Sequence, residues 1–507
     1  METNNFNSTY RKRIDVVQNV VEQKIEPEND VNIGKILCVN AKAYLDNVEV
    51  LNGEAYYNGE VVFDALFTDE QGNIINQTLN SNLQGKIEND TLNANMLPIY
   101  KVEVVNVSIQ NASASGLKAS ATVEITLDCL VNDEISVFDA ENDNIKVKQE
   151  TVSIFTTKNS GSATFNVSDE IEIKGTVNKQ LLKTATLTIK DVKSGTGYFT
   201  VEGDINFSMC YETGTEENKM IKCINECLPF KEEIEVDDLT KEQTVEIIAG
   251  LKPNDVVLTL QTEDETKTIY AFSATVSVKY FVLDKTEKEI TVDAYCTTHN
   301  LNLISESFNY TKLIQSICES KNVDCELSLQ EEQPRISKIL FVCGENVNIT
   351  NSYVLDDKLV VEGIVNANVV YLNDEENEEI CSIMVENPFK VELNEDVCYA
   401  ENVFVKTAIK DCMCHVKKGR DLELEFNIGI SANVYLTGQE SYLKEVELTE
   451  ELAQNPYSMQ IYFAPQNADI WDISKELRVS SEIITSQNPN LTFPLEKPEQ
   501  IVYFIQK

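Results

Sequence analysis

The chain has 507 residues, which is too many to fold around a single hydrophobic core. This length predicts three or four domains of ordinary size. Its 84 acidic side chains outnumber the 42 basic ones and give a formal net charge of −42, which repels phosphate backbones and anionic lipid surfaces. This charge disfavours nucleic-acid binding, while a composition of 42% hydrophobic and 25% charged residues is typical of a folded, soluble protein.

The N-terminal residues Met1–Phe6 are polar and offer no apolar stretch that could act as a secretory signal. No window of the chain approaches the roughly 18 apolar residues that a membrane-spanning helix needs. We therefore expect no membrane insertion and place the protein in a cytoplasm.

Three segments of the chain share one pattern, in which a glycine is followed eight residues later by an aromatic residue. The three pairs are Gly59 with Phe67, Gly203 with Tyr211, and Gly363 with Tyr371. Other landmarks keep step with these glycines, since Lys35, Lys179 and Lys338 lie 24, 24 and 25 residues before them. The agreement indicates three copies of one repeat.

Each copy continues with signals that are typical of antiparallel strands. A turn-rich polar segment follows each aromatic residue, at 69–73, 213–217 and 373–377, and predicts a hairpin. Runs of alternating apolar and polar residues end the copies, at 121–127, 274–282 and 424–435. We expect a mainly β protein with three tandem β-sandwich-like domains at residues 1–150, 151–320 and 321–450. A short helix is expected in a connecting stretch, at Tyr310–Ser320.

From Met459 onward the pattern changes to strand, helix, helix, strand. Residues 459–463 predict a strand, and 470–477 carry apolar residues at helical spacing. Ser480 is a suitable cap for a second helix that ends at 487–491, and 500–505 predict the last strand. The sequence therefore predicts a small βααβ module over residues 457–507. This segment has six acidic and four basic residues, so it is far closer to neutral than the rest of the chain.

Catalytic chemistry has few residues to use in this sequence. His299 and His415 are its two histidines, and it contains neither a Walker-type phosphate loop nor a Gly-x-Gly-x-x-Gly turn. The compact group Cys412-Met413-Cys414-His415 carries soft ligands, but strand alternation favours core packing of both cysteines over metal binding. We interpret most of the 13 cysteines as reduced core residues. We expect a protein that is not an enzyme, with no catalytic residues, no metal and no cofactor.

The layout of three repeats followed by a small module resembles that of the SPOCS-domain proteins of endospore-forming bacteria, over roughly residues 14–447. Within the module, residues 470–474 (Ile-Trp-Asp-Ile-Ser) are similar to the Leu-Trp-x-Ile-Ala core of LysM modules, and residues 488–491 are similar to their asparagine turn. Glycan-binding LysM modules carry Gly-Asp-Thr/Ser and Pro-Gly turns where this chain has residues 467–469 and 498–500. Because a turn with positive φ favours glycine, we expect the backbone beside the sugar groove to be reshaped. Peptidoglycan is therefore a doubtful ligand.

The resemblance implies a spore-coat assembly scaffold in the mother cell, located at the forespore surface, with a LysM-like module that binds the ATPase of the coat basement layer. Other coat proteins are further expected partners. The partner-binding positions implied by the motifs are Ile470, Trp471, Lys475, Asn488, Pro489, Asn490 and Leu491. The residues themselves leave two interpretations of Trp471 open, since it could brace the two helices or contact a partner at the surface.

Two alternative functions stay open at this point. The chain could be a peptidoglycan-binding LysM protein of the spore cortex or wall, against which the missing secretory signal and the altered turns argue. It could also be a structural subunit of a spore surface layer or fibre, because repeated β domains can polymerise through their edges.

Overall fold

The computed structural model describes residues 2–27, 31–113, 115–140, 142–215, 218–264, 266–376, 378–397, 402–453 and 458–504. Within these ranges the chain consists almost entirely of antiparallel strands, with two short α-helices near its C-terminal end. The expectation of a mainly β protein is confirmed. No helix in the described ranges has the length and apolar character needed to span a bilayer.

The first unit contains six strands in two sheets. They are β1 (Glu2–Ile25), β2 (Lys35–Leu51), β3 (Glu54–Thr68), β4 (Ile74–Glu88), β5 (Leu97–Ser113) and β6 (Gly116–Asp139). The first strand pairs with the last, in the order β1-β6-β5, and the three middle strands form a meander, β2-β3-β4. The two sheets enclose one hydrophobic core.

The second and third units follow the same plan. The second contains β7 (Ile145–Lys174), β8 (Lys179–Ser194), β9 (Tyr198–Thr215), β10 (Asn218–Glu235), β11 (Thr244–Gly250), the short 3-10 helix η1 (Pro253–Asp255), β12 (Val256–Glu263) and β13 (Lys267–Cys296). The third contains β14 (His299–Ser328), β15 (Ile336–Leu355), β16 (Lys358–Asn373), β17 (Ile380–Asp396), β18 (Asn402–Val416) and β19 (Asp421–Glu451). Their first and last strands pair as β7 with β13 and β14 with β19, and the meanders are β8-β9-β10 and β15-β16-β17.

The domain boundaries expected from the sequence differ from the boundaries of the hydrogen-bonded units. The strands of the three units run over residues 2–139, 145–296 and 299–451, so β14 begins inside the range 151–320 given above. Residues 310–320 belong to β14 and pair with β19, and the helix expected at Tyr310–Ser320 is therefore wrong. Of the range 457–507, Tyr457 and residues 505–507 lie outside the described part of the chain.

The glycine of each repeat has a structural cause that the three units share. Gly363 lies in the central strand β16 opposite Ile349, next to a bulge between Ile349 and Asn351 of β15. A Cβ atom at Gly363 would lie 2.6 Å from the Asn348 carbonyl oxygen and 2.8 Å from the Phe389 ring. Gly59 and Gly203 occupy the same place, opposite the last residue before a bulge. Only a residue without a side chain fits there, which explains why the anchor recurs.

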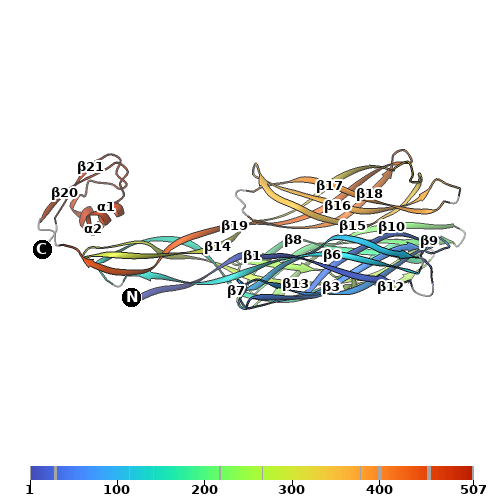
Figure 1. Ribbon diagram of the computed structural model, residues 1–507, viewed down its shortest axis with the longest axis horizontal. Helices are drawn as coiled ribbons and strands as arrows, with labels where there is room; N and C mark the ends of the chain where they lie inside the picture. The colour runs from blue at the N-terminus through green and yellow to red at the C-terminus, as the bar shows by residue number, and fades with distance from the viewer. Residues whose placement is uncertain are drawn as a thin grey trace.

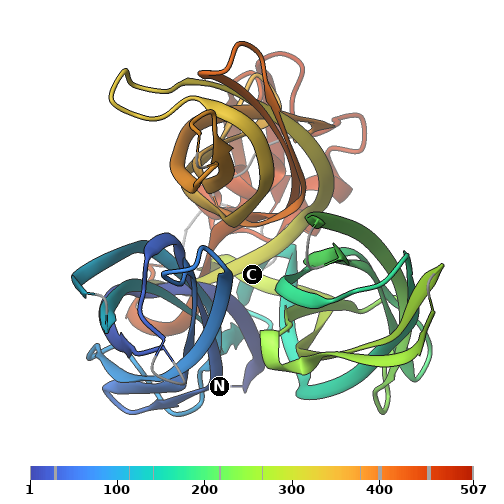
Figure 2. The ribbon, with the colours of Figure 1, turned by 90° about the vertical axis from the view of Figure 1, so that its right-hand side faces the viewer.

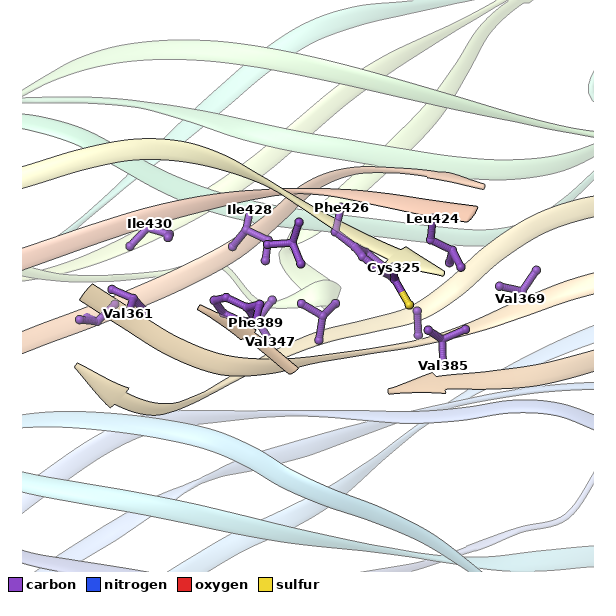
Figure 3. Packing of buried hydrophobic residues seen from close by; sticks show 14 of the residues in the cluster. Cys325, Val347, Val361, Val369, Val385, Phe389, Leu424, Phe426, Ile428 and Ile430 are labelled. Atoms are coloured by element: carbon purple, nitrogen blue, oxygen red, sulfur yellow. The ribbon is translucent and has the colours of Figure 1, made fainter. Parts of the chain in front are cut away.

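Alternation along the strands builds the cores, as Figure 3 shows for the third unit. Leu424, Phe426, Ile428 and Ile430 are fully buried at every second position of β19. Phe389 of β17 faces them across the unit. Cys412 and Cys414 of β18 also pack against this core, as their spacing predicts, and burial raises the pKa of the Cys414 thiol to about 12.

One pair of cysteines departs from the expectation of reduced thiols. Cys210 of β9 and Cys223 of β10 are directly opposite each other in the hairpin and form a disulfide, with their Cα atoms 4.1 Å apart. Ten further cysteines of the described residues are free thiols. The general interpretation of reduced core cysteines therefore holds for most of them, and this cross-strand pair is the exception.

The three units surround a common axis, which Figure 2 shows end on. The long strands of the pairs β1/β6, β7/β13 and β14/β19 continue beyond the units and run together as a stalk, toward the left of Figure 1. Phe6 of β1 and Phe308 of β14 pack edge to face inside the stalk, with their ring centroids 5.9 Å apart. They belong to an apolar cluster to which the strand pairs of every unit contribute. Its buried members are Phe6, Ile135, Val137, Val152, Ile154, Ile290, Phe308 and Tyr442.

A buried polar contact joins the three units where the stalk begins. Arg11 of β1 forms an ion pair with Asp128 of β6 at 2.7 Å, and its guanidinium lies over the ring of Tyr435 of β19. The Tyr435 hydroxyl donates a hydrogen bond of 3.0 Å to Glu246 of β11. One network therefore holds side chains from the first, second and third units together.

Candidate functional site

The C-terminal module forms at the far end of the stalk (Figure 1). It consists of β20 (Met459–Ala464), α1 (Ile470–Leu477), α2 (Ser481–Gln487) and β21 (Glu499–Phe504), and β20 pairs with β21 in antiparallel register. The Asp469 carboxylate caps α1 by accepting the Trp471 amide at 2.8 Å, and the Ser480 hydroxyl caps α2 by accepting the Glu482 amide. Ile473, Ile484 and Ile501 form the centre of its small core.

The helix α1 holds the module against the stalk through two of the expected partner-binding residues. The Trp471 Nε1–H donates to Asp293 of β13 at 2.8 Å, and Lys475 Nζ lies 2.7 Å from both oxygens of the same carboxylate. The Trp471 ring packs edge to face with Tyr295, whose hydroxyl donates to the Val479 carbonyl at 2.9 Å. These contacts place α1 on the second unit's part of the stalk.

Asp293 owes its position to an irregularity in β13. The register with β7 shifts between Thr291 and Asp293, so a bulge turns the carboxylate toward the module. Partial burial alone would raise the pKa of Asp293, but hydrogen bonds from Lys475 and Trp471 outweigh it and keep that pKa below its usual value. The carboxylate is therefore charged at neutral pH and pairs with the lysine.

The other expected partner-binding residues serve different ends. Ile470 and Leu491 pack against the module's own core. The Asn488 side chain donates to the carbonyls of Ile484 and Val502 at 2.8 Å each and accepts the Val502 amide at 3.1 Å, so it joins α2 to β21. Pro489 and Asn490 are exposed. The structure thus does not gather the seven residues on one surface.

The two altered turns differ in what they do to the backbone. Asn467 has a φ of 62°, so this position adopts the left-handed conformation that favours glycine. Asparagine is one of the few residues with a side chain that adopts this conformation readily. At the second turn Glu499 already belongs to β21 and pairs with Ala464.

An apolar surface of the module faces away from its core. Met459, Ile461 and Phe463 alternate with inward residues along β20 and are 49%, 50% and 76% exposed. Phe504 of β21, 51% exposed, is paired with Met459 in the sheet. We call these four residues the outer sheet face. Large apolar side chains gathered in this way are typical of a surface that binds another protein.

Sequence reasoning missed both the stalk residues that receive the module and the outer sheet face. The period-two alternation of 459–463 contained the signal for the latter, because its odd positions are apolar while Tyr462 and Ala464 point toward the core. Asp293 and Tyr295 offered no such signal, since their distance from Trp471 along the chain hides the contact. Among the described residues, no group of three or more histidine, cysteine or acidic side chains is arranged to hold a metal ion.

A family model described as SipL, SPOCS domain, matches residues 176–259 and 335–417. The first matched segment runs from just before β8 through β11 into β12 of the second unit, and the other runs from just before β15 to the end of β18 of the third. No curated protein and no solved structure matches the chain.

Proposed function

We propose that the chain is a sporulation protein and a non-enzymatic scaffold of spore-coat assembly, because its second and third units match the family model described as SipL, SPOCS domain. In this proposal it acts in the mother cell at the forespore surface and tethers coat layers by binding the ATPase of the coat basement layer. The three units form the body of the scaffold, and the C-terminal module is the part that binds the partner.

The outer sheet face carries this proposal. It is apolar, and it lies on a module that is close to neutral, whereas the rest of the chain is strongly acidic. A neutral, apolar surface adds little charge repulsion when this acidic chain meets a protein partner. Phe463 stands out as the anchor, because aromatic side chains contribute most to such contacts.

The Trp471 side of the module has a second role in the proposal. Trp471 and Lys475 already bind Asp293, so a partner reaches the outer sheet face while α1 keeps the module on the stalk. Force applied by an assembled coat layer would then pass from the partner through the module to the stalk. A tether needs such a continuous connection.

The test is binding of the full chain to the purified coat ATPase, measured by biolayer interferometry. Phe463→Glu places a charge in the outer sheet face, and we expect it to weaken binding at least about tenfold, as loss of an aromatic anchor does. Ile483→Glu is the matched control, since Ile483 is an exposed apolar residue of α2 in the same module. Equal affinity of both variants and the parent protein would exclude this surface.

A parallel assay with purified peptidoglycan separates the proposal from the cell-wall alternative. Saturable binding to peptidoglycan, with none to the ATPase, would assign the protein to the cortex or wall. The scaffold proposal expects the reverse.

A further inference from the structure

A cavity of about 1330 Å³ lies on the axis between the three units. Its wall contains residues of β2 and β5 from the first unit, of β8, β11 and β13 from the second, and of β15 and β18 from the third. We call it the central chamber. An apolar cluster that includes Leu37, Leu181 and Phe341, one residue from each unit, packs where the three meanders meet.

Three lysines, one from each unit, line the chamber at the same level. Strands β5, β11 and β18 begin at residues paired with Leu130, Leu283 and Tyr435. Four residues further along, the facing pairs are Lys101 with Thr126, Ile248 with Lys279, and Lys406 with Ser431. In the first and third units the lysine belongs to β5 or β18, whereas in the second it belongs to β13, the strand that pairs with β11. Each unit therefore supplies one lysine. We call Lys101, Lys279 and Lys406 the lysine triad, and it follows the threefold arrangement of the units.

The lysine triad carries more positive charge than its surroundings neutralise. Lys101 forms an ion pair with Glu103 at 2.7 Å. Lys279 donates to the Pro98 carbonyl at 3.3 Å and lies near the Tyr100 ring. Lys406 has no carboxylate or hydrogen-bond partner among the described residues and lies near the Phe404 ring. Within the described part of the chain, Glu103 is therefore the one carboxylate that forms an ion pair with any of these three lysines.

The environment of Lys406 is unusual for an unpaired cation. Burial, with the like charges of Lys101 and Arg11 acting in the same direction and Glu103 opposing them, lowers its pKa to about 8. Lys406 is partly exposed to the chamber, but an ammonium group that is largely withdrawn from water and has no counterion is costly, and an anion in the chamber would relieve that cost.

Acids elsewhere in the chamber wall have partners of their own. Asp411 accepts a hydrogen bond from Asn225 at 2.6 Å, and Asp64 accepts one from Thr78 at 2.6 Å. The buried Glu345 is attracted to Lys42, which lines the same wall. These carboxylates therefore do not supply the counterion that Lys406 lacks.

We propose that the central chamber binds a small multivalent oxyanion, a polycarboxylate or a phosphate compound, through Lys101, Lys279 and Lys406. Three ammonium groups contributed by three separate units suit a ligand with several charged oxygens. Bound there, the anion touches all three units at once and stabilises their association.

Thermal unfolding of the full chain tests the proposal, with citrate and inorganic phosphate as probes and sodium chloride of equal ionic strength as the reference. We expect a saturable rise of the unfolding temperature with at least one probe, and which probe acts identifies the carboxylate or phosphate class. Lys406→Met should increase the dissociation constant of the probe, read from the concentration that gives half of the rise, about tenfold or more, as loss of a charge-assisted contact does. Lys406→Arg should retain the effect of the probe.

Lys241→Met is the control, because Lys241 is an exposed lysine in a surface turn. It should leave the response to the probe unchanged. No stabilisation beyond that of chloride, or an equal response in Lys406→Met, would overturn the proposal. Either result is independent of whether the outer sheet face binds the coat ATPase.

Discussion

Tyr295 of β13 and Trp471 of α1 pack edge to face with their ring centroids 5.1 Å apart, and this contact fixes the C-terminal module to the stalk. The tryptophan therefore belongs to an interface between two parts of one chain. Neither of the two interpretations open from the residues alone, a brace between helices or a contact with a partner, describes that role. A partner that needs the Trp471 ring must first release the module.

Replacing Asp293 by alanine removes the acceptor of both Trp471 and Lys475. We expect the module to stay folded but to leave the stalk more often, because loss of charge-assisted hydrogen bonds costs about 1–3 kcal/mol of docking free energy. Hydrogen exchange at the buried Tyr295 region of β13 should become faster. Lys497→Ala, which removes an exposed ion pair with Glu499 in the same module, should not change that exchange.

Acidification should release the module at the same contact. The pKa of Asp293 is lower in the docked state than in the free state, so its stabilisation is present above the free value, near 4, and is lost as the pH falls below it. Trp471 is the only tryptophan of the chain, and its fluorescence reports docking directly. As the pH falls through this range, the emission should shift to the red in the parent protein. A shift of equal size in Asp293→Asn would contradict this assignment.

A methyl group at Gly363 should destabilise the third unit. The new Cβ atom would press against the Asn348 carbonyl and the Phe389 ring, and such overpacking costs about 1–3 kcal/mol. Chemical denaturation measures the loss. Gly250→Ala is the matched control in a strand, because no atom lies within 4 Å of its added Cβ position, and it should have little effect.

Replacing Lys406 by methionine should stabilise the protein at neutral pH in buffers without multivalent anions. The lysine has a pKa of about 8 in the folded state and an ordinary value of 10.5, so its charge opposes folding by on the order of 3 kcal/mol at neutral pH. This opposition fades as the pH rises from about 8 to 10.5, where the unfolded state also loses the proton. The difference in unfolding free energy between Lys406→Met and the parent should shrink over that range. If the difference in unfolding free energy stayed constant over that range, the lysine would have an ordinary pKa and a solvated ammonium group.

The sequence predicted the parts of the fold that depend on local pattern. Alternation identified β19, and Ser480 identified the start of α2. The helix expected at Tyr310–Ser320 failed for a local reason as well. The register of β14 with β19 shifts between Leu313 and Gln315, and the adjacent apolar pair Leu313-Ile314 at this bulge breaks the period of two and imitates a helix.

The remaining features depend on contacts between distant segments. The Cys210–Cys223 disulfide requires the register of the β9/β10 hairpin, which the cysteine spacing does not reveal. The lysine triad requires the arrangement of all three units, and Ile248 shows why the repeat pattern conceals it, since the second unit carries its lysine on the facing strand. No periodicity along one segment contains this information.

The shared stalk also limits how such a protein can change its size. A solenoid can gain or lose a repeat at its end, because each repeat contacts only its neighbours. Here every unit sends its first and last strands into one common cluster, and Phe6 near the start of the chain packs on Phe308 of the third unit. The ring closes at three members, so a fourth copy would find no place beside Phe6.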